Sequence, residues 1–68
     1  MKIELAQDKD GYTAKVAGRK NLFAFGYTKR EALDELASVG AAELESEQEV
    51  AMLEKRVHEY LHKLDNEG

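Results

Sequence analysis

The spacing of the apolar residues changes at Thr28, and this change limits the folds open to the chain. Before it, apolar and polar residues alternate over 2–7 and 12–16, the period of a β-strand with one buried face. After it, apolar residues recur every three or four positions, as in an amphipathic helix. The sequence predicts an α+β fold: a three-stranded antiparallel meander with one packing helix (β-β-β-α), followed by a second amphipathic helix.

Two turns separate the expected strands. In the turn at 8–11, the pair Asp10 and Gly11 is expected to supply the positive φ of a tight hairpin, and a second turn spans 18–21. The segment that follows, 22–27, is apolar or aromatic at almost every position. We therefore expect both faces of this third strand to need cover.

Two capping boxes predict where the helices begin. Thr28 with Glu31, and Ser46 with Glu49, have the spacing in which the first side chain caps a helix and the second bonds back. The first helix ends at a break near Glu45 and the second covers 46–65. We expect one domain over 1–68, with a β-β-β-α core at 2–45, the second helix at 46–65 and a loose tail at 66–68.

The chain is short and contains no cysteine, which excludes disulfides and thiolate zinc sites as sources of stability. Small domains commonly use self-association instead, so the composition predicts a homo-oligomer, most simply a dimer. Residues 1–6 show no apolar run typical of a signal peptide, and no stretch resembles a membrane span. We expect a cytoplasmic protein that does not contact membranes.

Charge is divided unevenly along the chain. Residues 1–30 hold seven Lys or Arg and three acids, whereas 31–68 hold three and eleven, so the strand half is basic and the helical half acidic. The basic doublets 19–20 and 29–30 suggest nucleic-acid contact. They flank opposite ends of the third strand, about 20 Å apart, so solvated turn residues are the favoured interpretation. The expected partner is not a nucleic acid.

Residues 58–62 match the H-E-x-x-H motif, in which two imidazoles bind zinc and the glutamate activates water. Such a site needs a third protein ligand, and only Asp65 and Glu67 follow His62 in this sequence. A chain with one small core also builds no obvious peptide cleft. We therefore predict no catalytic residue, metal or cofactor, and expect that the protein is not an enzyme.

Two apolar surfaces are the predicted interfaces. The first is the third strand, because an apolar edge strand without Pro or Lys pairs readily with another chain. In the alternative, the two helices of the same chain cover both faces of this strand. The second surface is the a/d seam of the last helix, which packs on another chain or folds back on its own sheet. The candidate residues are Leu22, Phe23, Phe25, Tyr27, Val50, Leu53, Val57, Tyr60 and Leu61.

Two segments resemble the HicB-like antitoxin family over roughly residues 2–40. One is 8–16, with Asp10, Gly11, Tyr12 and Ala14, and the other is the strand-to-helix junction from Gly26 to Leu36, with Thr28 and 31–33 in the family's pattern. The resemblance implies a β-β-β-α unit that self-associates and, in genuine antitoxins, masks a small RNA-cleaving toxin. The chain departs from the family at 18–21, and the acidic helix replaces the expected fourth strand.

These observations favour a non-catalytic protein-binding module, a HicB-like antitoxin or an orphan relative that lacks a separate DNA-binding domain. A small protein toxin is its expected partner besides a second copy of itself. One alternative is a small nucleic-acid-associated regulator, suggested by the basic strand half. Another is a metal-binding or metallopeptidase-like protein, suggested by the H-E-x-x-H motif alone.

Overall fold

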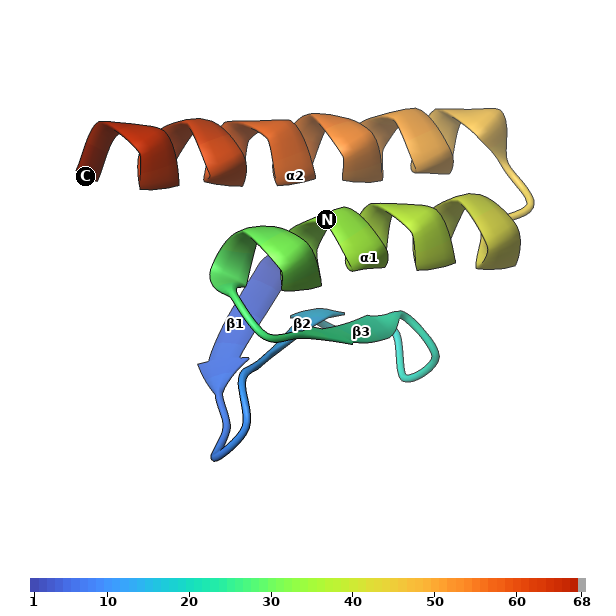
Figure 1. The fold of residues 1–68 in the computed structure, drawn as a ribbon. Helices are drawn as coiled ribbons and strands as arrows, with labels where there is room; N and C mark the ends of the chain where they lie inside the picture. The colour runs from blue at the N-terminus through green and yellow to red at the C-terminus, as the bar shows by residue number, and fades with distance from the viewer. Residues whose placement is uncertain (68) are drawn as a thin grey trace.

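The computed structural model describes residues 1–67 and confirms the predicted α+β fold. Three strands, β1 (Ile3–Gln7), β2 (Tyr12–Val16) and β3 (Phe23–Gly26), precede two helices, α1 (Lys29–Glu43) and α2 (Glu47–Glu67) (Figure 1). The antiparallel sheet has the order β1-β2-β3, so β2 is central and the other two strands are edges. Within 1–67, no helix is both long and apolar enough to cross a membrane.

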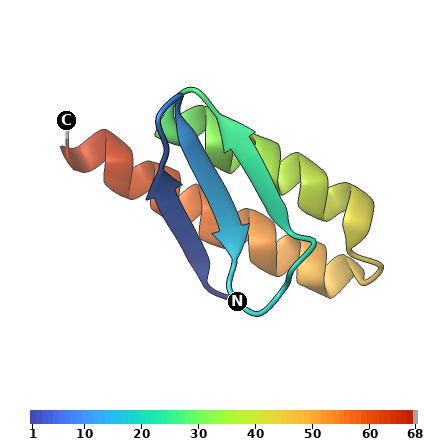
Figure 2. The ribbon, with the colours of Figure 1, turned by 90° about the horizontal axis from the view of Figure 1, so that it is seen from below.

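Both helices lie on the same side of the sheet (Figures 1 and 2). Helix α1 packs against β2 and β3, and α2 packs mainly against α1 and runs back beside it. Seen from the opposite side, the sheet has nothing in front of it (Figure 2). The domain therefore has two layers, and one face of the sheet is uncovered.

The two turns use their glycines differently from the prediction. Among residues 1–67 the glycine with a positive φ is Gly18, at 82°, in the second turn. The expectation of a positive φ at Asp10–Gly11 was wrong: this hairpin is closed by the Asp8 amide donating to the Gly11 carbonyl at 2.7 Å. Gly11 is needed for space, because a Cβ there would overlap the carbonyl oxygen of Gly26.

Helix boundaries follow the capping signals closely. Thr28 is the N-cap of α1, and its hydroxyl accepts the Glu31 amide at 3.0 Å. A break at 44–46 separates the helices, as predicted. Helix α2 continues to Glu67, so residues 66 and 67, expected in a loose tail, belong to the helix, and Gly68 lies outside the described residues.

The core lies between the covered face of the sheet and the two helices. Its largest fully buried side chains are Leu33, Leu36 and Leu53. Gly40 lies on α1 where Leu53 of α2 packs, and a Cβ at Gly40 would overlap the Leu53 side chain. This glycine allows the two helices to approach closely, which explains its place inside a helix. The remaining apolar side chains of the core are those of Ala14, Val16, Leu22, Ala24, Ala32 and Val57.

Candidate protein-binding surface

Side chains of β3 and of the residues that flank it, Leu22 and Tyr27, alternate between the core and the uncovered face of the sheet. Leu22 and Ala24 point into the core, whereas Phe23, Phe25 and Tyr27 are 57%, 43% and 70% exposed. The alternative in which the helices cover both faces of this strand is wrong, because both helices lie on one side. We call Phe23, Phe25 and Tyr27 the aromatic surface.

The strand register places polar and small residues beside the aromatic surface. Phe25 lies opposite Thr13, and Phe23 lies opposite Lys15. Lys15 in turn lies opposite Glu4, and their charged groups are 3.8 Å apart. Phe25 and Tyr27 contact each other edge to face, with ring centroids 5.5 Å apart, a favourable aromatic geometry. The uncovered face thus has an aromatic strip along β3 and a polar border on β2 and β1.

The other predicted interface residue on the third strand lies elsewhere. Leu22 is 3% exposed and belongs to the core on the covered face of the sheet. It is fixed there by its backbone, since its carbonyl accepts the Val16 amide at 2.9 Å. Leu22 is therefore inaccessible to a partner, because residues 22 and 23 of an extended chain point to opposite faces.

The seam of the last helix packs mainly against its own chain. Leu53 and Val57 are buried in the core, and Val50, Tyr60 and Leu61 are partly buried. The sequence left open whether this seam packs on another chain or on its own. Leu53 and Val57 pack within their own chain. Met52, which the sequence did not single out, is 49% exposed on α2, and single exposed apolar residues are ordinary on protein surfaces.

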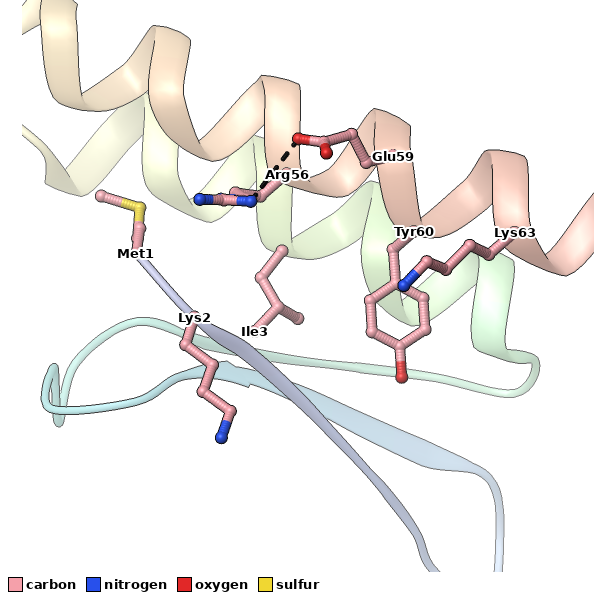
Figure 3. Close-up of a pocket in the computed structure, with 7 residues that line it drawn as sticks. All are labelled: Met1, Lys2, Ile3, Arg56, Glu59, Tyr60 and Lys63. Atoms are coloured by element: carbon pink, nitrogen blue, oxygen red, sulfur yellow. Dashed lines mark ion pairs between the residues drawn. The ribbon is translucent and has the colours of Figure 1, made fainter.

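A shallow hollow of about 360 Å³ lies between the start of β1 and the C-terminal half of α2 (Figure 3). Ile3 rises into it from β1, and the Tyr60 ring descends from α2 towards the sheet. Arg56 and Glu59, 3.7 Å apart, and Lys63 form the helix side. Sequence reasoning missed this hollow because it joins the two ends of the chain, and only the helix-strand packing brings them together.

The H-E-x-x-H residues lie on the exposed side of α2. His58, Glu59 and His62 are all exposed. Glu59 makes its ion pair with Arg56, and Asp65, one of the two downstream candidates for a third ligand, pairs with Arg30 of α1. Within residues 1–67, no group of three or more His, Cys, Asp or Glu side chains is placed to hold a metal ion.

The basic doublets are engaged with different parts of the fold. Arg19 pairs with Glu49 at the start of α2, and Arg30 pairs with Asp65. The Lys29 ammonium lies 5.9 Å from the centre of the Tyr12 ring, within the range of a cation–π contact. The two ion pairs connect the basic half of the chain to the acidic half, so part of the charge division along the sequence is compensated within the molecule.

Comparisons with protein-family models, curated proteins and solved structures find no match to this chain. The resemblance to HicB-like antitoxins stays a prediction from the two sequence motifs.

Proposed function

We propose that this chain is a non-catalytic protein-binding module related to HicB-like antitoxins, acting in the cytoplasm. It self-associates, and its aromatic surface binds a second protein, which in an antitoxin is a small toxin. The observation that carries the proposal is the uncovered sheet face, on which Phe23, Phe25 and Tyr27 are exposed while the sheet's other face is covered by both helices. Contiguous exposed apolar patches typically mark interaction sites.

The chemistry of this face suits a protein partner. Phe and Tyr supply large contact areas at low conformational cost and are enriched at protein interfaces. The edge-to-face contact of Phe25 with Tyr27 joins the two rings into one apolar surface, and such aromatic pairs are favourable beyond the area that they bury. The exposed ion pair of Glu4 with Lys15 lies beside them, as a polar rim lies around the apolar centre of an interface.

The positions of the two HicB-like motifs in the fold support this assignment. The first motif forms the turn after β1 and the whole of β2, and the second joins β3 to α1. In the second motif, the first turn of α1 packs directly on the backbone of β3, and a Cβ at Gly26 would overlap the backbone of Ala32. A glycine followed by a capped helix is therefore a packing requirement of this junction.

The test is co-purification with any small protein that a neighbouring gene encodes, together with the solution mass from light scattering. We expect a mass of twice 7.7 kDa at about 100 µM, where a dimer with a micromolar dissociation constant is formed. Phe25→Lys should weaken partner binding roughly tenfold or more. Met52→Lys is the matched control, because it places the same charge on a similarly exposed apolar residue of α2.

Two results would overturn the proposal. One is a monomeric chain that retains no neighbouring gene product. The other is a complex that Phe25→Lys weakens no more than Met52→Lys does, which would place binding away from the aromatic surface. A complex lost with Phe25→Lys and kept with Met52→Lys supports it.

A nucleic-acid-associated regulator is the second candidate, and one observation favours it. Lys15, Arg19, Lys20 and Phe23 line a common hollow on the uncovered face, and single strands bind where aromatic rings lie beside cations. Lys15 and Arg19 are already paired with Glu4 and Glu49, and the chain carries a net charge of −4, so the protein-binding function is favoured.

Fluorescence anisotropy with a short single-stranded RNA tests the second candidate. Binding that weakens steeply between about 50 and 200 mM salt, and that Phe23→Ala removes, would favour it. No binding at the lower salt concentration would exclude it.

A further inference from the structure

We propose that β1 is the strand through which two copies of this chain associate. Two β1 strands pair antiparallel, with the two-fold axis at Ile3, and join the sheets into one of six strands. This inference rests on the self-association in the proposed function and assigns its surface, which is distinct from the aromatic surface.

The outer edge of β1 is free to form hydrogen bonds in the described chain. β1 is an edge strand, and no other element lies beside its outer edge within the sheet (Figure 2). The Ala17 amide donates to the Lys2 carbonyl at 2.9 Å, so Lys2, Glu4 and Ala6 direct their backbone groups towards β2. Because the direction alternates along a strand, Ile3 and Leu5 present their amides and carbonyls outward.

The core is incomplete along the same edge. On the covered face, Ile3 and Leu5 of β1 are only partly buried, whereas Ala14 and Val16 of β2 are buried. The hollow of Figure 3 lies here, between β1 and the Tyr60 side of α2. Apolar side chains that remain half-exposed along a free strand edge gain burial when another strand is added.

Charge and apolar matching select the register. With the axis at Ile3, Ile3 lies opposite its own copy, Met1 lies opposite Leu5, and Lys2 lies opposite Glu4. The apolar residues of the covered face, Met1, Ile3 and Leu5, are then all matched, and the Lys2–Glu4 pairs have opposite charge. An axis at Glu4 would place the two Glu4 carboxylates opposite each other, and an axis at Leu5 would place Ile3 opposite the polar Gln7.

Backbone geometry agrees with the Ile3 register. Ile3 directs its amide and carbonyl outward, so two Ile3 residues can exchange both hydrogen bonds. Lys2 and Glu4 then form non-hydrogen-bonded pairs, in which side chains of an antiparallel sheet lie closest. Since Glu4 already lies beside Lys15, each Glu4 would lie between Lys15 of its own chain and Lys2 of the second copy.

The β3 edge fits a second copy less well. Helix α1 already covers the core side of β3, where Leu22 and Ala24 are buried. A second strand added there would therefore bury little further apolar surface on the covered face. Pairing through β1 also keeps both aromatic surfaces free, on one continuous face, about 24 Å apart across the six strands.

A charge-swap experiment tests the β1 pairing by light scattering and sedimentation. In either single variant, Lys2→Glu or Glu4→Lys, positions 2 and 4 of the two copies carry like charges at both of their contacts in the dimer. Each variant should therefore raise the dissociation constant of the dimer roughly tenfold or more. The double variant Lys2→Glu with Glu4→Lys should restore the wild-type constant, and an equimolar mixture of the two single variants should form a heterodimer. Lys15→Glu is the control, since it breaks the in-chain pair with Glu4 but lies one strand inside the edge.

The outcomes separate this inference from the proposed function. Single variants as dimeric as wild type, with no rescue in the double variant, would overturn the β1 pairing. If Phe25→Lys then abolished the dimer, self-association would stand and would be placed at β3. A wild-type chain that is monomeric at about 100 µM would overturn the self-association on which both depend. Circular dichroism of each variant checks that a lost dimer is not an unfolded chain.

Discussion

The two edges of the sheet differ in how far the helices close the core beneath them. At β3, α1 packs directly on the strand, Leu22 and Ala24 are buried, and the large side chains that remain, Phe23 and Phe25, face the uncovered side. At β1, the covered face is lined by partly buried Ile3. One edge has a closed core and an apolar outer face, and the other has an open core and a charged outer face.

This difference arises from the order of packing. Helix α1 follows β3 after two residues, so it must lie over β3 and β2, whereas α2 packs against α1 and reaches β1 only across the hollow at Tyr60. One helix hairpin on three strands therefore covers the sheet unequally. The two edges therefore offer different surfaces: the β3 side exposes aromatic rings, the surface of the proposed function, and the β1 side leaves apolar side chains that an added strand would cover.

The largest expected effect compares matched leucines on the two sides. Leu36 of α1 is fully buried in the closed part of the core, and Leu64 of α2 is partly buried. Leu36→Ala should lower the free energy of unfolding by about 2–5 kcal/mol, the range for a buried leucine that leaves a cavity. Leu64→Ala should cost less than about half of that, because it removes less buried surface.

Urea denaturation of both variants measures this difference. A total stability of roughly 3–10 kcal/mol is typical of a chain this size, so a Leu36→Ala variant that is unfolded without urea also meets the expectation. Equal losses for the two leucines would show that the core is closed at both edges of the sheet.

The next effect concerns how tightly α1 is fixed to β3. A Cβ at Gly26 would overlap the backbone of Ala32, whereas a Cβ at Gly40 would overlap the end of the Leu53 side chain. Backbone moves less readily than a side-chain terminus, so Gly26→Ala should destabilise the fold by about 1–3 kcal/mol or more. Gly40→Ala should stay within about 1 kcal/mol of wild type, because alanine regains helix propensity.

Thermal unfolding followed by circular dichroism measures both glycine variants. If Gly26→Ala were as stable as Gly40→Ala, the junction between β3 and α1 would be looser than the structure has it. The motif glycine would then have no packing role.

Much of the fold was predictable from local signals. The change of apolar period at Thr28 gave the order of strands and helices, and the Thr28 capping box marked the start of α1. Because side chains alternate along an extended chain, Leu22 could have been placed on the opposite face from Phe23 and Phe25. The sequence does not indicate which face is covered, because residues on both faces are apolar. That choice depends on both helices packing on one side, which is a tertiary property.

The hollow at β1 and the closeness of Gly26 to Ala32 were not predictable, for a different reason. Both depend on distances between segments rather than on residue type, and no periodicity within one segment records them. The positive φ at Gly18 rather than Gly11 likewise depends on how each turn closes. Sequence pattern indicated which residues are apolar, and packing determined which of them are accessible.

A smaller effect compares the two predicted capping boxes. The Thr28 hydroxyl accepts the Glu31 amide, so Thr28→Ala should cost about 1 kcal/mol. Among the described residues the Ser46 hydroxyl accepts no comparable bond, although its carbonyl accepts the Val50 amide at 3.0 Å. Ser46→Ala should therefore cost less. Urea midpoints of the two variants measure the difference, and a larger loss for Ser46→Ala would contradict the assigned cap.

The smallest effect tests what holds α2 over the open side of the core. The ion pair of Arg30 with Asp65 joins the start of α1 to the end of α2, but both side chains are at least half exposed. Exposed pairs contribute at most about 1 kcal/mol and are screened by salt, so Arg30→Ala should change stability little at about 0.1 M salt and not at all at 1 M. A loss above that range would mean that the ion pair, rather than the partly buried Tyr60 and Leu64, fixes this half of the helix. The open-core edge would then be held by charge, and a second strand at β1 would have less apolar surface to complete.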